Sequence, residues 1–363
     1  MGKITLGEVA IESKATWKSD KVGVPIVGLE HLEPGEITLS NWEIDSENTF
    51  TKKFLKGQVL LGRRRVYLRK AVMAPVAGIC SGDITVIEAI PGKILPELLP
   101  FVIQNDKFFD YAVQGSAGSL SPRVKWEHLK KYSFELPSID EQKVLANKLW
   151  GAYRLKESYK NLLSATDEMV KSQFIEMFGC KTPNVKVGDV SSVVSGKSIS
   201  KDLEDIPGDI AYVKVADFNL PENNKYIQVS SRYVTSENAN SSKLIPPGTI
   251  IFAKNGAASM SNKKRLTAIE CCIDMNTLAI IPNSQKVDSE FLYAIFDSLD
   301  LSFYVRQGAV PSISPHAIEG IEIYLPSFDE QLSFSKICKQ ADKSKFELRK
   351  SIDAIDKVIK SLI

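Results

Sequence analysis

Cysteine and histidine are scarce in this sequence, and their placement excludes the sites that depend on them. The chain has 363 residues and only five cysteines, of which Cys271 and Cys272 are adjacent, and no Cys-x-x-Cys pair occurs. Neither a zinc site nor a disulfide framework is predicted, and a reducing compartment fits best. Cys271 and Cys272 are expected to fill core space. The three histidines, His31, His128 and His316, have no spacing that indicates metal ligation or acid–base catalysis.

Long apolar segments are also missing. No run approaches the ~20 apolar residues that a membrane helix needs. The N-terminal residues have no apolar signal core, so secretion is not expected. With 44% hydrophobic and 25% charged residues the composition is that of a globular protein, and we expect a cytoplasmic one without membrane contact.

The sequence lacks the motifs of several enzyme classes. There is no Gly-x-x-x-x-Gly-Lys-(Ser or Thr) loop for nucleotide phosphates and no Gly-x-Gly-x-x-Gly. An Asn-Pro-Pro-aromatic tetrad, a His-x-Glu-x-x-His and a paired-carboxylate site are absent as well. We therefore predict a binding protein that has no cofactor and no catalytic site of its own. The net charge of +2 neither requires nor excludes nucleic acid, because local patches matter more than the total.

The chain contains an internal repeat. Residues 136–142 read Leu-Pro-Ser-Ile-Asp-Glu-Gln, and residues 325–331 read Leu-Pro-Ser-Phe-Asp-Glu-Gln, at an offset of 189 (325 − 136). Three further blocks recur in the same order at similar offsets, among them 6–9 with 187–190. Four blocks in one order indicate a tandem duplication of about half the chain, with a pseudo-two-fold relation between the halves.

Each half has the same plan, a mixed globule followed by a long helix, which places the chain in the α+β class. Short β-branched runs predict strands, and helices are expected between them at 96–109 and 288–299. The sequence predicts no sheet topology. Strands are expected at 59–61, 84–87, 249–252 and 277–281.

The long helices are predicted at 138–179 and 327–363. Ser138 stands three residues before Glu141, and Ser327 three before Glu330, which is the spacing of a capping box. No proline follows in either segment. Both segments therefore have a start signal and nothing that interrupts them.

Heptad-spaced apolar residues predict that the two helices pair as a coiled coil. The alternative, two helices packed on their own globules, is disfavoured because both seams keep the 189-residue offset. The polar seam residues Lys156 and Lys345 either specify register or extend their stems to solvent, and we favour the second. The apolar seam comprises Leu145, Leu149, Ala152, Tyr159, Leu163, Val170, Phe334, Ala341, Leu348, Ile352, Ile355, Ile359 and Leu362.

The chain resembles the specificity subunit of type I DNA restriction–modification systems. The repeated motif that opens each long helix resembles the spacer regions of that family. Segments 56–70 and 245–256 resemble parts of its target recognition domains, and so do 121–124 and 310–314 just before each helix.

This resemblance implies two target recognition domains, 1–137 and 180–326, separated by the helices 138–179 and 327–363, which form an antiparallel coiled coil. It implies a bipartite double-stranded DNA target with an unspecified gap. It also implies two methyltransferase (modification) subunits and added restriction subunits as partners, with S-adenosylmethionine and ATP/Mg bound by those partners.

A basic segment in the first half is a candidate for DNA contact. It places five cations and one aromatic residue within eight positions, a composition that attracts phosphates and includes arginine, which can pair with guanine. The alternative is a solvated basic loop. The candidate residues are Arg63, Arg64, Arg65, Tyr67, Arg69 and Lys70.

The second half has a looser counterpart, Lys254 and Asn255 followed by Lys263, Lys264 and Arg265. Asparagine can read adenine, although beside glycine it is more often a turn residue. Because the two clusters differ, two different half-sites are expected. Two rival functions stay open: a coiled-coil scaffold that does not touch DNA, and a DNA-modifying enzyme with an unrecognised motif.

Overall fold

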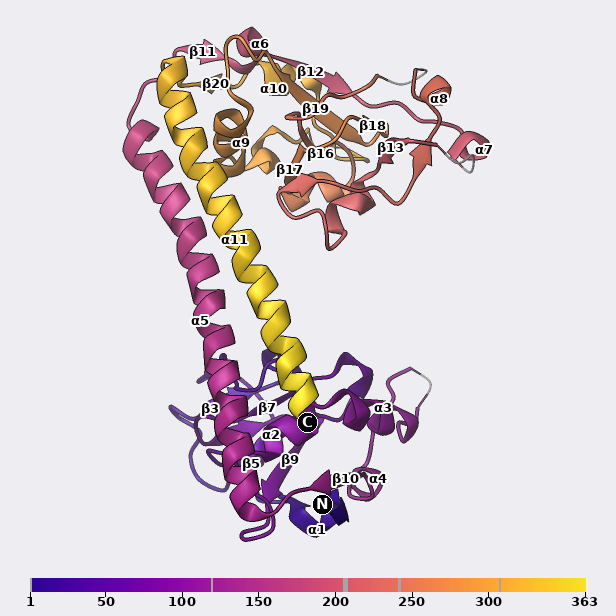
Figure 1. Ribbon diagram of the computed structural model, residues 1–363, viewed down its shortest axis with the longest axis vertical. Helices are drawn as coiled ribbons and strands as arrows, with labels where there is room; N and C mark the ends of the chain where they lie inside the picture. Colours follow the sequence, from indigo (N-terminus) through magenta and orange to yellow (C-terminus); the bar gives the residue numbers. More distant parts are fainter. Residues whose placement is uncertain (1, 119, 205–207, 241–242, 307) are drawn as a thin grey trace. The chain divides into compact units, whose positions relative to one another are not determined.

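The computed structural model describes residues 2–118, 120–204, 208–240, 243–306 and 308–363 (Figure 1). The described chain forms two compact units, residues 1–161 with 348–363 and residues 162–347. Each unit combines one globule with half of each long helix, α5 (Ile139–Phe178) and α11 (Phe328–Leu362). The sequence predicts two globules and two separate spacer helices. The compact units divide the chain differently, because each long helix belongs partly to one unit and partly to the other.

Two four-stranded sheets and one two-stranded sheet form the first globule. One sheet has the order β2-β9-β6-β7 with antiparallel neighbours, and the other has the order β4-β3-β8-β5 with β3 and β8 parallel. Strands β1 and β10 pair antiparallel. The strands are β1 (Gly2–Thr5), β2 (Ala10–Glu12), β3 (Pro25–Val27), β4 (Glu43–Ile44), β5 (Lys52–Phe54), β6 (Val59–Gly62), β7 (Ala71–Met73), β8 (Gly78–Cys80), β9 (Ile84–Ala89) and β10 (Ser133–Leu136).

Short helices complete this globule. The expected helix at 96–109 is in fact two helices, because Asn105 has an extended ψ of 138° and its side chain accepts a hydrogen bond from the Lys107 N–H. This N-cap ends one helix and starts the next. The helices are α1 (Leu6–Val9), η1 (Leu29–His31), η2 (Val66–Leu68), α2 (Leu99–Gln104), α3 (Asp106–Gln114) and α4 (Trp126–Leu129).

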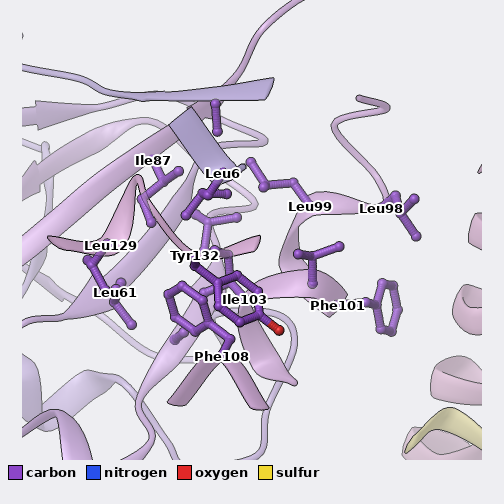
Figure 2. Close-up of a cluster of buried hydrophobic side chains, with 14 of the residues drawn as sticks. Leu6, Leu61, Ile87, Leu98, Leu99, Phe101, Ile103, Phe108, Leu129 and Tyr132 are labelled. Carbon is purple, nitrogen blue, oxygen red and sulfur yellow. The ribbon is translucent and has the colours of Figure 1, made fainter. Parts of the chain in front are cut away.

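The core of the first unit is a layer of aliphatic and aromatic side chains between these helices and the β2-β9-β6-β7 sheet. Figure 2 shows Leu61 and Ile87 from the sheet beside Leu6, Phe108 and Tyr132. The first four of these are completely buried. The apolar residues of α11 near the C-terminus pack against the same cluster, so both ends of the chain contribute to this unit.

The second globule has a five-stranded sheet, β12-β19-β16-β17-β14, and a three-stranded sheet, β15-β13-β18. Strands β11 and β20 pair antiparallel. Only the β14–β17 and β13–β18 pairs are parallel among the described strands of this globule. The strands are β11 (Val185–Lys186), β12 (Ser191–Ser195), β13 (Ile210–Val213), β14 (Tyr226–Ile227), β15 (Tyr233–Val234), β16 (Ile250–Ala253), β17 (Lys264–Thr267), β18 (Cys271–Ile273), β19 (Thr277–Pro282) and β20 (Glu322–Ile323).

The expected helix at 288–299 is present as α9, and Asp288 is its N-cap. Cys271 and Cys272 lie in β18 and are completely buried, which confirms their predicted core role. The helices are α6 (Val187–Val190), α7 (Lys201–Glu204), η3 (Val215–Asn219), α8 (Ser236–Asn240), η4 (Ala257–Ser261), α9 (Ser289–Ser298), η5 (Leu301–Tyr304) and α10 (Pro315–Glu319).

The sheet orders confirm the duplication. The order β2-β9-β6-β7 of the first globule returns as β12-β19-β16-β17 in the second. The parallel pair β3–β8 returns as β13–β18, and the terminal pair β1–β10 returns as β11–β20. The two globules thus share a topology although most of their residues differ.

The repeated motif forms the same set of hydrogen bonds at the start of each long helix. The Glu141 carboxylate accepts hydrogen bonds from the N–H and hydroxyl of Ser138 at 2.9 and 2.8 Å, as the capping box predicts. The completely buried side chain of Gln142 donates to the Pro137 carbonyl and accepts from the Leu95 N–H. Glutamine thereby ties the helix start to a neighbouring loop.

The second copy repeats these bonds. Ser327 donates to Glu330 at 3.0 Å from its N–H and 2.7 Å from its hydroxyl. Gln331 donates to the Pro326 carbonyl at 3.0 Å and accepts from the Asp288 N–H at 2.8 Å.

Helices α5 and α11 pack together within each unit and run antiparallel. In the second unit Lys345 pairs with Asp167, and further along α5 the Phe174 ring contacts Phe334, which lies earlier in α11. In the first unit Lys156 pairs with Asp356, and Leu145 lies near Leu362. All the predicted apolar seam residues are buried or half-buried. The coiled coil expected from the heptads is therefore present, with the antiparallel direction that the family resemblance implies.

The preference for solvent at the two lysines of the seam is wrong. Lys156 is 9% exposed and bonds to Asp356, and Lys345 bonds to Asp167. An ammonium group left unpaired at a helix–helix contact would lose hydration without compensation, and each aspartate supplies that compensation.

Candidate nucleic-acid interface

The arginine-rich loop after β6 is held in a defined conformation by its backbone. The Arg63 N–H donates to the Asp83 carbonyl at 2.9 Å, and the Arg65 N–H donates to the Pro122 carbonyl at 2.8 Å. The Val124 N–H donates in turn to the Arg63 carbonyl at 3.0 Å. Arg65 has a φ of 53°, in the left-handed region that residues with a side chain rarely occupy. The loop is therefore fixed against the rest of its domain.

Two of the predicted cations stabilise the first domain itself. Arg69 donates to Asp106 and, at 2.8 Å, to Asp110, both on α3. The Lys70 ammonium donates to the Leu29 carbonyl at 2.8 Å. These contacts occupy the side chains, so neither residue is a free cation for a phosphate.

Arg64 and Arg123 converge on one carboxylate. Arg123 binds Asp83 with two hydrogen bonds, at 2.7 Å from Nε and 3.1 Å from Nη2, and Arg64 Nη1 lies 3.7 Å away. The Arg123 hydrogen bond holds the pKa of Asp83 below its usual range. Arg64 Nε also donates to Ser121 Oγ at 2.5 Å. The carboxylate orients both guanidinium groups while each side chain stays about two-fifths exposed.

The remaining residues of the basic segment differ in access. Arg65 and Tyr67 are exposed, and among the described residues no side-chain hydrogen bond of either is found. The Arg63 side chain is half-buried, and its Nε has no hydrogen-bond partner in the part of the chain that the structure describes. The accessible face of this loop is thus Arg64, Arg65 and Tyr67.

The corresponding loop of the second domain, after β16, is held by the same three backbone bonds. The Lys254 N–H donates to the Asn276 carbonyl at 2.7 Å, and the Gly256 N–H donates to the Pro311 carbonyl at 2.8 Å. The Ile313 N–H donates to the Lys254 carbonyl at 2.9 Å. Gly256 has a φ of 68°, which glycine adopts without strain.

Side chains at equivalent positions can therefore be compared directly between the domains. The backbone of Arg64 forms an antiparallel β-bridge with that of Arg123 in the first domain, and the backbone of Asn255 forms one with that of Ser312 in the second. An arginine cluster in one domain corresponds to an amide cluster in the other. The equivalent pairs are Arg64 and Asn255, Asp83 and Asn276, and Arg123 and Ser312.

Lys264 and Arg265 do not fit the predicted role in DNA contact. Lys264 is 3% exposed, its ammonium donates to the Leu299 carbonyl at 2.5 Å, and burial lowers its pKa. Arg265 donates to the carbonyls of Asn223 and Phe218 at 3.0 and 2.9 Å. Both cations satisfy carbonyl groups inside the domain, so they belong to its structure.

Lys254 and Lys263 remain nearer the surface. The Lys254 ammonium donates to Ser195 Oγ at 3.2 Å, and its side chain is half-buried. Lys263 is exposed and donates to Asn219 Oδ1 at 2.6 Å. Lys263 is thus the more accessible cation of the second cluster.

Sequence reasoning missed four members of these clusters: Asp83, Arg123, Asn276 and Ser312. The signal was present, since Asp83 and Asn276 each stand directly before an expected strand, 84–87 or 277–281. Arg123 and Ser312 lie in the repeated segment before each long helix. Comparing the repeats position by position would have found them.

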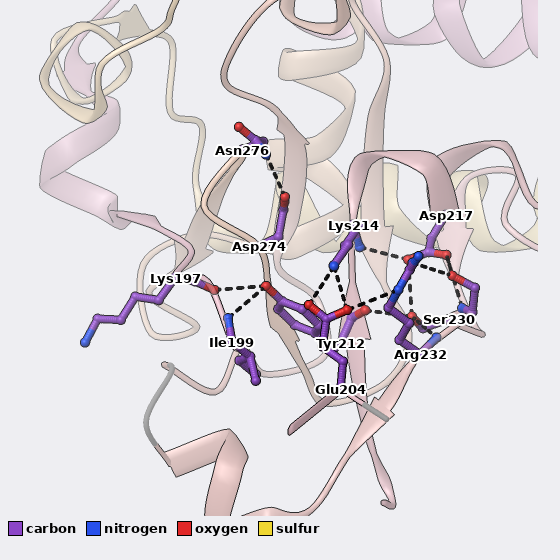
Figure 3. Close-up of polar contacts among 11 residues, drawn as sticks. Lys197, Ile199, Glu204, Tyr212, Lys214, Asp217, Ser230, Arg232, Asp274 and Asn276 are labelled. Atoms are coloured by element: carbon purple, nitrogen blue, oxygen red, sulfur yellow. Dashed lines mark hydrogen bonds and ion pairs between the residues drawn. The ribbon is translucent and has the colours of Figure 1, made fainter. Parts of the chain in front are cut away.

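A polar network lies beside the amide cluster in the second domain (Figure 3). Asp217 accepts from the hydroxyls of Ser231 and Ser230 at 2.6 and 3.2 Å, and Lys214 donates to Glu204 at 2.7 Å. These groups satisfy one another. Within the described ranges, no group of three or more His, Cys, Asp or Glu side chains is arranged to hold a metal ion.

Comparison with known proteins finds a family match for the second domain and most of the C-terminal helix. Residues 181–356 match the family model of the type I restriction modification DNA specificity domain. This segment is similar in sequence to the DNA specificity domain of type I systems. The match includes β11 to β20 and most of α11, and the resemblance stated from the sequence is confirmed.

Solved structures extend the likeness in fold to the whole chain. The type I restriction–modification system S subunit from M. genitalium is similar at a TM-score of 0.60 and 15% identity, over 100% of this chain and 96% of that one. A chain from a study of complex assembly and conformational transition of the type I R-M system is similar at 0.58 and 17%, over 99% and 96%. In the described part of the chain, no helix has the length and apolar character to cross a membrane.

Proposed function

We propose that this chain is the sequence-specific DNA-binding subunit of a type I restriction–modification complex, with each domain reading one half of a bipartite target. The observation that carries the proposal is the pair of equivalent loops, held by the same three backbone bonds but presenting different side chains. Recognition of two different half-sites requires loops of the same backbone conformation that expose different side chains. The family match of the second domain supports it.

The accessible residues divide into two groups by chemistry. Arg65 and Lys263 are exposed cations suited to phosphate contact, which fixes the register of a protein on DNA. Arg64 and Asn255 are held by neighbouring side chains and carry the donor and acceptor patterns that read base edges. Tyr67 offers an aromatic face beside the first group.

The chain directs other subunits and performs no chemistry itself in this proposal. Two methyltransferase subunits and restriction subunits are the expected partners, and S-adenosylmethionine and ATP/Mg belong to them. The two long helices begin with the same capping hydrogen bonds and are copies of one another. They offer each methyltransferase subunit an equivalent docking surface.

Selection of bound duplexes tests the proposal. The chain, purified with its methyltransferase subunits, is mixed with random duplex DNA, and the bound fraction is sequenced at several salt concentrations. We expect a bipartite motif and an affinity that falls as salt rises. DNA binding without sequence preference, or no binding, would favour the scaffold function. Methyl transfer by the chain alone would favour the enzyme.

A further inference from the structure

Asn255 belongs to a relay of hydrogen bonds in the second domain. Its Nδ2 donates to Asn276 Oδ1 at 3.2 Å, and Asn276 Nδ2 donates to Asp274 Oδ2 at 2.9 Å. Figure 3 shows the second of these contacts as a dashed line between Asn276 and Asp274. Thr277 Oγ1 donates to the other oxygen of Asp274 at 2.7 Å. Asp274 is buried, with 7% exposure, and the relay runs from it toward the surface.

The relay fixes which way each amide points. A carboxylate only accepts hydrogen bonds, so Asn276 must turn its NH₂ toward Asp274. Its carbonyl oxygen then faces Asn255, and an oxygen accepts only from the NH₂ of that residue. The orientation of the Asn255 amide is thus set, through Asn276, by the buried carboxylate of Asp274.

The fixed amide keeps one donor and one acceptor for a ligand. One N–H of Asn255 is used by Asn276, and for the second N–H and for Oδ1 no partner is found among the described residues. A side chain that accepts and donates side by side matches adenine in the major groove, which donates from N6 and accepts at N7.

We propose that Asn255 reads an adenine in the half-site of the second domain, with Asn276 and Asp274 as positioning residues. This inference rests on the proposed function and names the base class for one position. The first domain places Arg64 at the equivalent position, bound to Ser121 and near Asp83. Its guanidinium only donates, which suits guanine O6 and N7, so the equivalent position of the two half-sites carries different bases.

The test uses the full chain in complex with its methyltransferase subunits. Binding is measured by sequencing bound duplexes from a library in which each position of the wild-type motif is varied to all four bases. Asn255→Asp replaces the NH₂ group by an oxygen, so the side chain loses both the bond to Asn276 and the free N–H and only accepts. We expect the preference for adenine at one position to fall about 5- to 150-fold, the ratio that corresponds to ~1–3 kcal/mol, and cytosine, which donates from N4, to gain.

Two further variants separate base reading from other effects. Asn224→Asp adds the same charge at an exposed site of the same domain and should leave every base preference unchanged. Asn276→Ala frees the orientation of Asn255 and should weaken the adenine preference at the same position without a gain for cytosine. Thermal melting checks that each variant keeps the wild-type fold.

The outcomes are distinguishable. A change at one adenine position of one half-site, in Asn255→Asp and Asn276→Ala but not in Asn224→Asp, supports the relay. A wild-type motif that Asn255→Asp leaves unchanged, or changes uniformly at all positions, overturns the inference while the proposed function stands. A wild-type complex with no sequence preference overturns the proposed function itself.

Discussion

Lys156 on α5 and Asp356 on α11 form an ion pair with 2.7 Å between Nζ and Oδ1. The duplication repeats it, because the residues 189 positions away, Lys345 and Asp167, pair at 2.8 Å. The two lysine side chains are 11% and 13% exposed. Each unit therefore keeps the same polar contact in an otherwise apolar seam, as expected of a contact that specifies how the helices pair.

Removal of one partner tests this contact. Asp356→Ala leaves the Lys156 ammonium unpaired, and we expect the free energy of unfolding in urea to fall by about 1 kcal/mol, since Asp356 is 39% exposed and solvent screens the pair. Asp353→Ala, an exposed change on the same helix, should cost less. The exchange Lys156→Asp with Asp356→Lys should restore part of the stability. Equal destabilisation by the two alanine variants would contradict the role of the pair.

The glutamine at the start of each long helix provides a second test. Gln331→Ala leaves the Asp288 N–H without its acceptor and the Pro326 carbonyl without its donor. Gln331 is 1% exposed, so both backbone groups lie beside a buried side chain. We expect a destabilisation of about 2–3 kcal/mol, because the groups left behind are shielded from water. Gln340→Ala, on the exposed face of α11, should change stability little. Similar unfolding midpoints for the two variants would show that the loop contact is dispensable.

Acid stability should depend on Asp342. Burial raises the pKa of this carboxyl, but Lys225 and Lys345, at 2.6 and 3.0 Å, together outweigh burial, and the folded-state pKa lies below the ordinary 3.8. A depressed pKa stabilises the fold above the unfolded-state value, and this stability is lost as pH falls through the folded-state value. The Asp342→Asn variant should therefore be less stable than the wild type near neutral pH. Its stability should fall less than that of the wild type when the pH is lowered from about 5 to about 2. Thermal melting across this range, with Asp353→Asn as the control, gives the comparison. Parallel profiles for wild type and Asp342→Asn would refute it.

The arginines of the loop after β6, of which Arg64 and Arg65 are exposed and Arg63 is half-buried, should contribute to DNA affinity. Replacing Arg63, Arg64 and Arg65 by alanine should weaken binding by the assembled complex, and the slope of log K against log salt should shrink by up to about 0.9 for each phosphate that the variant no longer binds. If Arg64 contacts a base instead, the variant should lose ~1–3 kcal/mol of discrimination between the correct and the wrong base at that position. Replacement of Lys14, Lys18 and Lys21 removes the same charge elsewhere in the domain. If both triple variants bind alike, the arginine loop has no special role.

The sequence was sufficient to predict the repeat, the α+β class and the helix pair, because each depends on local signals. The capping boxes and heptads that indicate α5 and α11 are read within a few turns of helix. Sheet order could not be predicted, since β6 lies between β9 and β7 through pairings that span different sequence distances. The break at Asn105 was missed because its neighbours are good helix residues and only the cap separates them.

The candidate site was predicted less well, for a physical reason. Whether a cation is free depends on what surrounds it, and Lys264 and Arg69 are occupied by groups distant in sequence, Leu299 and Asp106. Lys264 did carry a signal, because it shares a strand face with the buried Leu266 at a spacing of two. Where the structure leaves cations exposed, at Arg65 and Lys263, contact with DNA stays a prediction.

A map of methylated bases tests the central claim, that each domain reads its own half-site. The map is made by sequencing DNA from cells that carry the methyltransferase subunits with either the wild-type chain or a chain whose residues 10–120 come from another specificity subunit. We predict a bipartite motif for the wild type, and for the exchanged chain a motif in which one half has changed and the other half is the same. A change in both halves, or in neither, would contradict the account.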